Sequence, residues 1–225
     1  MIRRLILQTI LWIAAMGALL FIPAGTPAWP AAWVYLAEMG ATSLAVGLWL
    51  ARYNPELLAE RMSSLIQREQ KPWDKLLMAG LIVLWCAWLV LMALDSVRYG
   101  WSQVPRGVQI VGMIGVLVGM HIAYRTLRTN SFAVPVVKIQ KERGHKVVTT
   151  GPYRHVRPPR YSGALVIFLS VPLLLGSWYG LLLVPPMAVA LGIRAIMEER
   201  ALTGELEGYE EYAARVRYRL IPLIW

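Results

Sequence analysis

The residues best suited to chemistry lie in two polar stretches near the end of the chain. The first, Gly144–Gly163, combines glycine and proline with tyrosine, histidine and several basic side chains, directly before an apolar segment. The second begins at Arg194 and Glu198, which are four residues apart and therefore share one face of a helix. Such groups could hold a charged ligand at a membrane surface. The same composition is also typical of a basic loop with an aromatic belt and of an ordinary helix-end ion pair.

Other familiar sites are excluded by the residues that the chain lacks. It has three histidines and one cysteine, and none of them falls into an HExxH or CxxC pattern, so we expect no metal. There is no GxSxG elbow, no phosphate-binding P-loop and no GxGxxG motif. Any nucleotide-like cofactor must therefore bind without a Rossmann or P-loop fold.

The elements that must position these side chains are membrane-spanning helices. Of the 225 residues, 57% are hydrophobic and 16% are charged, against about 25% charged in an average soluble domain. About 20 apolar residues suffice to cross the hydrocarbon core of a bilayer as a helix. The sequence predicts an all-α polytopic transmembrane protein of five to six spans, and its apolar segments are Leu5–Ile22, Ala31–Leu50, Leu76–Leu94, Val108–Tyr124, Tyr161–Leu175 and Tyr179–Met197.

The distribution of basic residues predicts the orientation of these spans. If the N-terminus is cytoplasmic, 21 of the 23 Lys and Arg residues fall in cytoplasmic segments, and only Arg98 and Arg106 lie outside. Both termini are then cytoplasmic, and a bacterial inner membrane is the expected location. The net charge of +10 is explained by orientation and by attraction to membrane lipids, so no nucleic-acid partner is expected.

The chain divides into two parts at about residue 127. Residues 1–127 are predicted to be N-terminal transmembrane helices with short links, and residues 128–225 contain the polar stretches, the last helical hairpin and a cytoplasmic C-terminal segment. Within that segment, Leu206–Leu220 is expected to form an amphipathic helix that covers whatever the preceding loop binds. Its apolar side would carry Tyr209 and Tyr212.

Three features inside the predicted spans have packing interpretations. Gly112, Gly115 and Gly119 would allow close approach of a second helix. Glu38 is expected to make an interhelical hydrogen bond. His121 is expected to be a hydrogen-bonded residue at the membrane interface rather than a ligand.

Three motifs in order resemble the isoprenylcysteine carboxyl methyltransferase family and, more distantly, the phospholipid N-methyltransferases. They are Gly-Pro-Tyr-Arg-His-Val-Arg-x-Pro-x-Tyr-x-Gly over residues 151–163, Arg-x-x-x-Glu-Glu-x-x-Leu over 194–202, and Gly-Tyr-x-x-Tyr-x-x-x-Val-x-x-x-x-x-Pro over 208–222. The resemblance is specific over about residues 138–225. It implies an enzyme that binds S-adenosylmethionine from the cytosol and admits a lipophilic acceptor sideways from the bilayer. Residues 128–225 would then be the catalytic methyltransferase region.

The resemblance also implies roles for individual residues. Cofactor contacts would fall on Lys138, Gln140, His145, Lys146, Val147, Val148, Tyr153, Pro159, Tyr161 and Glu198. Arg194 would face the carboxylate of the acceptor and hold it bidentately, so that Arg194 and Glu198 together form the catalytic pair. The family usually has Arg-His-Pro where this chain has Arg157-Pro158-Pro159, so Pro158 replaces a side chain expected beside the cofactor.

The expected activity is methyl-ester formation on a prenylcysteine-like or other lipid acid. Two alternatives remain open on the sequence. One is methylation of a phospholipid amine. The other is a non-catalytic membrane lipid-binding or assembly protein on the same scaffold, which the departure at Pro158 motivates.

Overall fold

A computed structural model of the chain describes all residues except 64–66, 68–69 and 222–225. Arg68 of the charge count and Pro222 of the third motif lie outside the described residues. The described part contains helices and no strand. The α-helices are α1 (Ile2–Ala24), α2 (Pro30–Tyr53), α3 (Pro55–Arg61), α4 (Pro72–Ala93), α5 (Arg106–Thr129), α6 (Pro159–Leu175), α7 (Val184–Glu205) and α8 (Tyr209–Arg215). Short π and 3₁₀ turns are η1 (Leu94–Arg98), η2 (Lys141–Arg143), η3 (Gly151–Arg154) and η4 (Tyr179–Leu183).

Five of the described helical segments are long and apolar enough to cross a membrane, and α6 is a sixth, shorter apolar helix. The all-helical, multi-span architecture predicted from the sequence is therefore confirmed. The segment between the second and third predicted spans contains a short helix, α3, which begins at Pro55. The Asn54 side chain caps this helix by accepting a hydrogen bond from Leu57 N at 3.1 Å.

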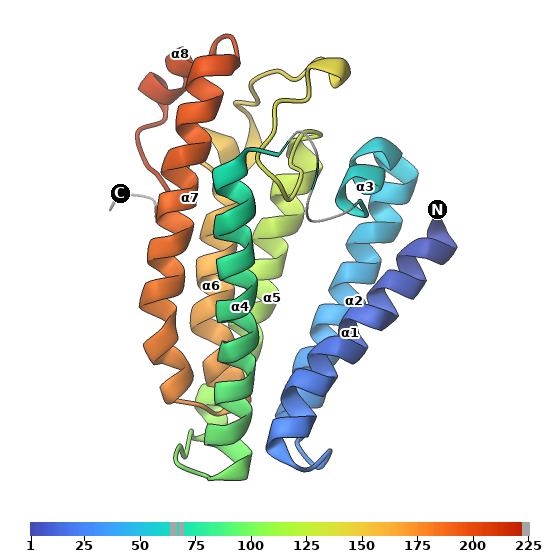
Figure 1. Ribbon diagram of the computed structural model, residues 1–225, viewed down its shortest axis with the longest axis vertical. Coiled ribbons are helices and arrows are strands. Elements are labelled where there is room, and N and C mark those ends of the chain that lie inside the picture. Colours follow the sequence, from blue (N-terminus) through green and yellow to red (C-terminus); the bar gives the residue numbers. More distant parts are fainter. Residues whose placement is uncertain (64–66, 68–69, 222–225) are drawn as a thin grey trace.

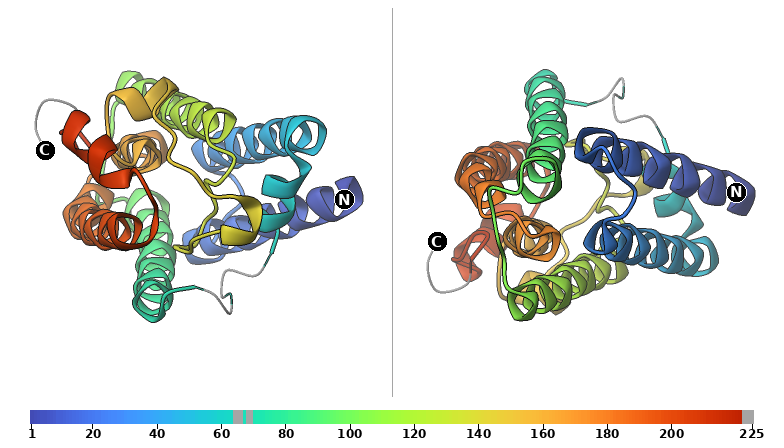
Figure 2. Two further views of the ribbon diagram at one scale, coloured as in Figure 1. Left: turned by 90° about the horizontal axis from the view of Figure 1, so that it is seen from above. Right: turned by 90° about the horizontal axis from the view of Figure 1, so that it is seen from below.

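The long helices alternate in direction and form two groups (Figure 1). One group consists of α4, α5, α6 and α7. The other is the pair α1 and α2, which leans away from the first group toward the end that carries α3 and α8 (Figure 1). In the view along the bundle, the segment between α5 and α6 crosses the space between the two groups at that end (Figure 2).

Small residues bring α5 and α6 into direct backbone contact. A Cβ atom added at Gly112 would lie 2.3 Å from the backbone nitrogen of Leu174, and one at Gly119 would lie 2.8 Å from the carbonyl oxygen of Gly163. At Gly115 an added Cβ would meet the hydroxyl of Ser170. The packing interpretation of the three glycines is therefore confirmed, and this contact fixes the start of α6, where the site begins.

The hairpin between α6 and α7 is also confirmed, and a buried carboxylate closes it. Asp95, which is fully buried in η1, accepts hydrogen bonds through Oδ2 from the hydroxyls of Ser102 (2.7 Å) and Ser177 (2.5 Å). Pro185 and Pro186 lie inside the predicted segment Tyr179–Met197, where a proline pair would be expected to kink a helix, but they do not kink the middle of the last helix. They lie in the first turn of α7, because η4 absorbs the preceding residues and proline fits the first helical positions.

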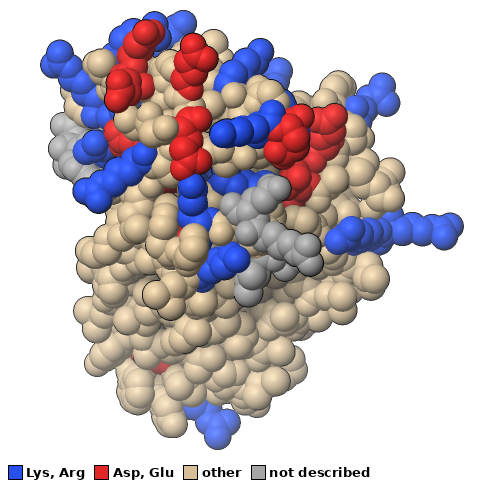
Figure 3. All heavy atoms as spheres, turned by 45° about the horizontal axis from the view of Figure 1, so that its top comes forward, with Lys and Arg blue, Asp and Glu red and all other residues tan. Residues whose placement is uncertain are grey.

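Charged side chains gather at one end of the molecule. Figure 3 shows Lys, Arg, Asp and Glu over the end that carries α3 and α8, whereas most of the remaining visible surface is uncharged. Large apolar side chains such as Ile10, Leu11 and Val83 are exposed on the long helices. An apolar girdle below a charged cap is what a lipid-embedded bundle requires.

The hydrogen bond expected for Glu38 is not formed by its buried Oε2 atom, which has no hydrogen-bond partner among the described residues. His121 is exposed on α5 and lies beside Tyr124, with ring centroids 6.3 Å apart, and no hydrogen bond of its ring occurs within the described part of the chain.

Candidate active site

A pocket opens at the charged end of the bundle, between the segment that follows α5 and the ends of α7 and α8. Its cavity volume is about 70 Å³. Its wall is made by Asn130, Phe132, Ala133, Val134, Val136, Val137, Lys138, His145, Lys146, Val147, Val148, Tyr153, Arg157, Pro158, Arg160, Glu198, Leu202, Leu206, Tyr209 and Tyr212. Apolar and aromatic walls with a few charged groups are typical of a small-molecule site.

Buried side chains hold the backbone of the pocket's inner wall. Four consecutive carbonyl oxygens, from residues 132 to 135, each accept a hydrogen bond from a different side chain. The donors are Gln140 to Phe132 (2.9 Å), Arg61 to Ala133 (3.0 Å), Arg160 to Val134 (2.8 Å) and Arg194 to Pro135 (2.6 Å). Irregular backbone near a membrane needs such partners, because lipid offers none. Arginines from α3, α6 and α7 therefore shape this wall.

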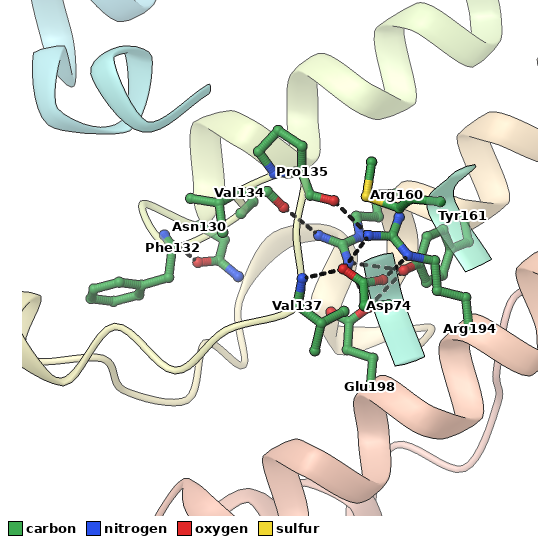
Figure 4. Close-up of polar contacts among 12 residues, drawn as sticks. Asp74, Asn130, Phe132, Val134, Pro135, Val137, Arg160, Tyr161, Arg194 and Glu198 are labelled. Carbon is green, nitrogen blue, oxygen red and sulfur yellow. Dashed lines mark hydrogen bonds and ion pairs between the residues drawn. The ribbon is translucent and has the colours of Figure 1, made fainter. Parts of the chain in front are cut away.

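Asp74 at the start of α4 completes the anchoring. Its Oδ1 accepts from Arg194 Nε at 2.8 Å, and its Oδ2 accepts from the backbone of Val137 at 2.9 Å and from Gln70 at 2.9 Å (Figure 4). Asp74 is fully buried and Arg194 is 7% exposed. The Arg194 guanidinium therefore lies behind the pocket wall. Its Nε and Nη2 donate to the Asp74 carboxylate.

Glu198, one turn after Arg194 on α7, does reach the pocket. Its Oε2 accepts hydrogen bonds from Arg160 at 2.5 Å and from the hydroxyl of Tyr161 at 2.7 Å (Figure 4). The Arg160 guanidinium also lies over the Tyr161 ring, 4.8 Å from its centroid. These contacts fix the Glu198 carboxylate, while its Oε1 makes no hydrogen bond within the described part of the chain.

Most of the cofactor residues expected from the resemblance lie together in this wall, namely Lys138, His145, Lys146, Val147, Val148, Tyr153 and Glu198. Gln140, Pro159 and Tyr161 are buried behind it. Gln140 contacts the carbonyl of Phe132, and Tyr161 contacts Glu198, so both act on the wall from outside the pocket. Arg194 is not part of the lining either.

Helix α8 and its flanking residues cover one side of the pocket. Tyr209 and Tyr212 pack against Tyr153, and the Tyr212 hydroxyl donates to the Tyr153 carbonyl at 2.8 Å. The helix is shorter than the expected Leu206–Leu220, because it ends at Arg215 and the chain then extends back to pair Arg157 with Arg219. Burial raises the pKa of Tyr153 to about 12, so this hydroxyl stays protonated at neutral pH.

His145 is held as a neutral side chain. Its Nδ1 accepts a hydrogen bond from the backbone of Gln140 at 3.4 Å, and its ring stacks on Phe132 with centroids 4.6 Å apart. Burial, together with the neighbouring Arg143 charge, lowers the pKa of His145 below its ordinary value of 6.5. His145 is therefore a packing and acceptor group of the wall at neutral pH.

Two cationic side chains of the wall keep unused donors. The Nε atoms of Arg157 and Arg160 are buried and have no hydrogen-bond partner within the described residues. A buried donor without a partner costs about 1–3 kcal/mol, so the wall suits a ligand with a hydrogen-bond acceptor at these two atoms. The charges of the two guanidiniums are balanced within the chain, by Glu199 at 3.1 Å from Arg157 and by Glu198 at 2.5 Å from Arg160. No cluster of three or more His, Cys, Asp or Glu side chains that could hold a metal ion occurs in the described part of the chain.

The residues that the sequence analysis missed are mainly the anchors. Asp74 and Arg61 lie in the N-terminal part, far along the chain from the motifs, and no local spacing connects them to the pocket. A signal does exist for Asp74, since a carboxylate at the start of an apolar helix is a costly residue that needs a partner. Asn130, Phe132, Leu202 and Leu206 line the pocket as well, and their types carry no chemical signature.

Comparisons with known proteins agree with this location. The family model of the phospholipid methyltransferases matches residues 108–207, which include most of α5, the loop between α5 and α6, and all of α6 and α7. A protein-S-isoprenylcysteine O-methyltransferase of Dictyostelium discoideum is 24% identical over 143 residues, which are 63% of this chain and 56% of the relative. The chain thus spans about half the length of that relative. Both matches agree with the resemblance, and the part of the chain that the family model covers, residues 108–207, includes the first two of the three motifs.

Proposed function

We propose that this protein transfers a methyl group from S-adenosylmethionine to a lipophilic acceptor that arrives from the bilayer, and that the acceptor group is a carboxylate. The observation that supports this most directly is the pocket itself. It joins the cytoplasmic cap to the ends of membrane-embedded helices, and its wall offers buried cationic donors together with the fixed carboxylate of Glu198.

The residues present fit S-adenosylmethionine. Its amino-acid carboxylate would be held by Arg157 and Arg160, whose buried Nε atoms have no partner within the described residues. Its polar groups would contact Glu198, and its adenosine would lie among Leu202, Leu206 and the α8 tyrosines Tyr209 and Tyr212. When bound, the cofactor supplies an electrophilic methyl group on a sulfonium. The role of the chain is then to bind, to orient and to exclude water.

A carboxylate acceptor needs no general base, because it is already ionised at neutral pH. Positioning and desolvation would supply most of the rate. We propose that Arg194 orients the acceptor carboxylate through Nη1, because Nε and Nη2 are engaged with Asp74 and the Pro135 carbonyl. The contact would be made by one nitrogen rather than by the bidentate fork that the sequence analysis expects.

A second candidate, methylation of a phospholipid amine, is supported by one observation. Asp74 neutralises Arg194, so the charge that would attract an anionic acceptor is already compensated. An amine acceptor would have to lose its proton before attack. The match to the phospholipid methyltransferase model agrees with either acceptor.

The test is a transfer assay in lipid nanodiscs with a methyl-labelled donor. We expect label in base-labile esters of a prenylcysteine, whereas base-stable label on lipid headgroups would establish the second candidate. Binding of S-adenosylmethionine by calorimetry gives an independent readout. Failure of the purified, folded protein to bind it would favour the non-catalytic lipid-binding or assembly protein, and recovery of binding in Pro158→His would trace the loss to that position.

Two variants separate the proposed roles. Glu198→Ala should weaken cofactor binding by about tenfold or more, because a charge-assisted contact is lost. Arg194→Ala should abolish turnover, and because it also leaves the buried Asp74 without its cation, cofactor binding is measured on the folded fraction of this variant. Arg194→Lys should not restore turnover, since one ammonium group cannot hold Asp74 and the Pro135 carbonyl and also reach the acceptor. Glu207→Ala, at an exposed position, is the matched control. Normal activity and affinity in both site variants would show that the site is misassigned.

We also propose that both termini face the cytosol of a bacterial inner membrane. The concentration of charge at the end with α3 and α8 supports this orientation (Figure 3). The two predicted parts of the chain, residues 1–127 and residues 128–225, would both contribute to the site. We propose that residues 128–225 hold the chemistry and that residues 1–127 contribute anchors, of which Asp74 and Arg61 are examples.

A further inference from the structure

Two hollows outside the active-site pocket adjoin each other on the surface of α5. The first lies between α2 and α5 and is lined by Thr42, Ala45, Val46, Trp49, Leu117, Met120, His121 and Tyr124. The second lies between α5 and the η3 turn, and its wall consists of His121, Ile122, Arg125, Gly151, Pro152, Arg154 and His155. They share His121, and neither shares a lining residue with the active-site pocket.

The second hollow has a strongly basic wall. It carries the guanidiniums of Arg125 and Arg154 and the imidazoles of His121 and His155, and no carboxylate lines it. All four side chains belong to exposed residues. No ion pair or side-chain hydrogen bond of these four residues occurs within the described part of the chain. An anion could therefore bind these positively charged side chains without breaking an existing ion pair.

The first hollow is an apolar groove at the depth of the membrane interface. On α5, Leu117, His121 and Arg125 follow one another at four-residue intervals, so the groove and the basic wall form one stripe about 12 Å long. On the α2 side, Trp49 makes an edge contact with Tyr124, with ring centroids 5.6 Å apart. Tryptophan and tyrosine mark the headgroup level of a bilayer.

We propose that this stripe binds an anionic phospholipid, with one acyl chain in the groove between α2 and α5 and the phosphate on the basic wall. The charges select the headgroup, since each basic side chain near an anionic lipid surface adds a favourable interaction. The groove selects a chain, because its lining is mostly apolar and it opens beside lipid-facing helices. A soluble anion would use only the upper half of the stripe.

The position of the site explains what the lipid would do for the protein. Arg154 and Tyr153 are adjacent in η3, and Arg154 lines the basic wall while Tyr153 lines the active-site pocket. A headgroup bound to Arg154 therefore restricts the motion of the η3 turn, which also positions Tyr153 in the active-site pocket. The lipid is a bound component of the fold beside the acceptor, and it is not the acceptor itself.

Trp49 provides a direct probe. The protein is placed in nanodiscs that contain a small fraction of either brominated phosphatidylglycerol or brominated phosphatidylcholine in an unbrominated phosphatidylcholine background. Because the chain has ten tryptophans, the signal of Trp49 is obtained as the difference between the wild type and Trp49→Phe. We expect the anionic lipid to quench this difference signal at a lower mole fraction than the zwitterionic lipid.

Charge-removing variants give the expected size of the effect. Arg125→Gln and Arg154→Gln should each raise the half-quenching fraction of phosphatidylglycerol by about fivefold, and together by about 25-fold. Arg128→Gln is the matched control, since it is an exposed arginine one turn further along α5 that lines neither hollow. It should leave the half-quenching fraction unchanged.

Several results would overturn the proposal. Equal quenching by the two brominated lipids would remove the headgroup preference, and an unchanged double variant would remove the basic wall. Loss of the preference in 10 mM inorganic phosphate, without quenching by the acyl chain, would mean a soluble-anion site. Displacement of the quencher by a prenylcysteine would assign the groove to the acceptor. If Trp49→Phe does not fold, native mass spectrometry of the unaltered chain and the arginine variants counts retained phosphatidylglycerol, and equal retention rejects the site.

Discussion

Asp74 illustrates at the scale of a single residue how this site is held. One carboxylate receives hydrogen bonds from α7 through Arg194, from the pocket wall through Val137 and from Gln70. Each contact alone is ordinary. Because all three end on one buried group, its removal leaves a guanidinium and a backbone amide without their acceptor.

Asp74→Ala should destabilise the protein by about 3–5 kcal/mol, since it leaves the buried Arg194 charge uncompensated. The double variant Asp74→Leu with Arg194→Met should recover most of that loss, because it removes both charges. Thermal unfolding in detergent measures the effect. Glu205→Gln, which breaks the more exposed ion pair with Lys71, serves as control and should change stability by less than about 1 kcal/mol. A single variant as stable as this control would contradict the anchoring role.

His145 should make the stability of the site sensitive to acid. Its pKa in the folded chain is lowered by burial and by Arg143, so the unfolded chain binds the proton more tightly. Stability is therefore complete above the ordinary value of 6.5 and declines as the pH falls from there toward the lowered pKa. Unfolding midpoints between about pH 5 and 8 test this. His145→Asn should flatten the decline, whereas the same change at the exposed His155 should not.

Individual site residues differ in how far the sequence could predict them. Tyr153 and Glu198 belong to ordered motifs with recognisable neighbours, and both line the pocket. Asp74 is 120 residues from its partner Arg194, and only the fold brings the two together. The role of Arg194 behind the wall was equally hidden, because its spacing from Glu198 shows a shared helix face and not what lies opposite.

At the scale of the helices, the α5–α6 contact determines where the site can form. Three glycines on α5 let the α6 backbone approach, and α6 begins at Pro159, directly after Pro158 of the pocket wall. The pattern of small residues four apart predicted this contact, because only small side chains allow it. The end of α8 at Arg215 was not predictable, since the amphipathic pattern continues past it while the backbone turns away.

Gly112→Ala should lower the unfolding temperature markedly, because its new Cβ would lie 2.3 Å from the Leu174 backbone, which cannot move aside as a side chain can. The cost should be at least about 2 kcal/mol. Gly107→Ala is the matched control on the same helix, since an added Cβ there meets nothing within 4 Å. It should leave stability equal or raise it by up to about 1 kcal/mol. Equal effects of the two substitutions would show that α5 and α6 are not tightly packed.

At the scale of the whole molecule, hydropathy predicted five to six spans and their approximate bounds, and the described part has five long apolar helical segments and the shorter α6. The physical reason is that lipid requires continuous apolar helices, so composition and fold are tightly linked. The way α1 and α2 lean away from the other helices (Figure 1) was not predictable, because it depends on the loop after α5, which packs in one apolar cluster with residues of α1, α2 and α3. The path of the loop depends in turn on arginines from three different helices.

The proposed orientation can be tested by cysteine labelling in intact cells. Cys86, the one cysteine of the sequence, is first replaced by Ala. A membrane-impermeant maleimide should then label Gly107→Cys from outside the cell and Gly204→Cys only after lysis. Both glycines have room for a side chain, so neither substitution should disturb packing. The reverse labelling pattern would place the active-site pocket on the outer face.

The hydrogen-bonded carbonyls of residues 132–135 have a consequence for the synthesis and membrane insertion of the protein. Translation produces these carbonyls before three of their four donors, because Gln140 follows Phe132 by 8 residues, Arg160 follows Val134 by 26 and Arg194 follows Pro135 by 59. At about 5–20 residues per second, the wall waits several seconds for its last guanidinium. A nascent chain that has inserted α5 therefore still lacks a pocket, and the site closes only when α7 enters the membrane and brings Arg194 to Asp74. Insertion of the last span is thus the step that makes the polypeptide able to hold a ligand.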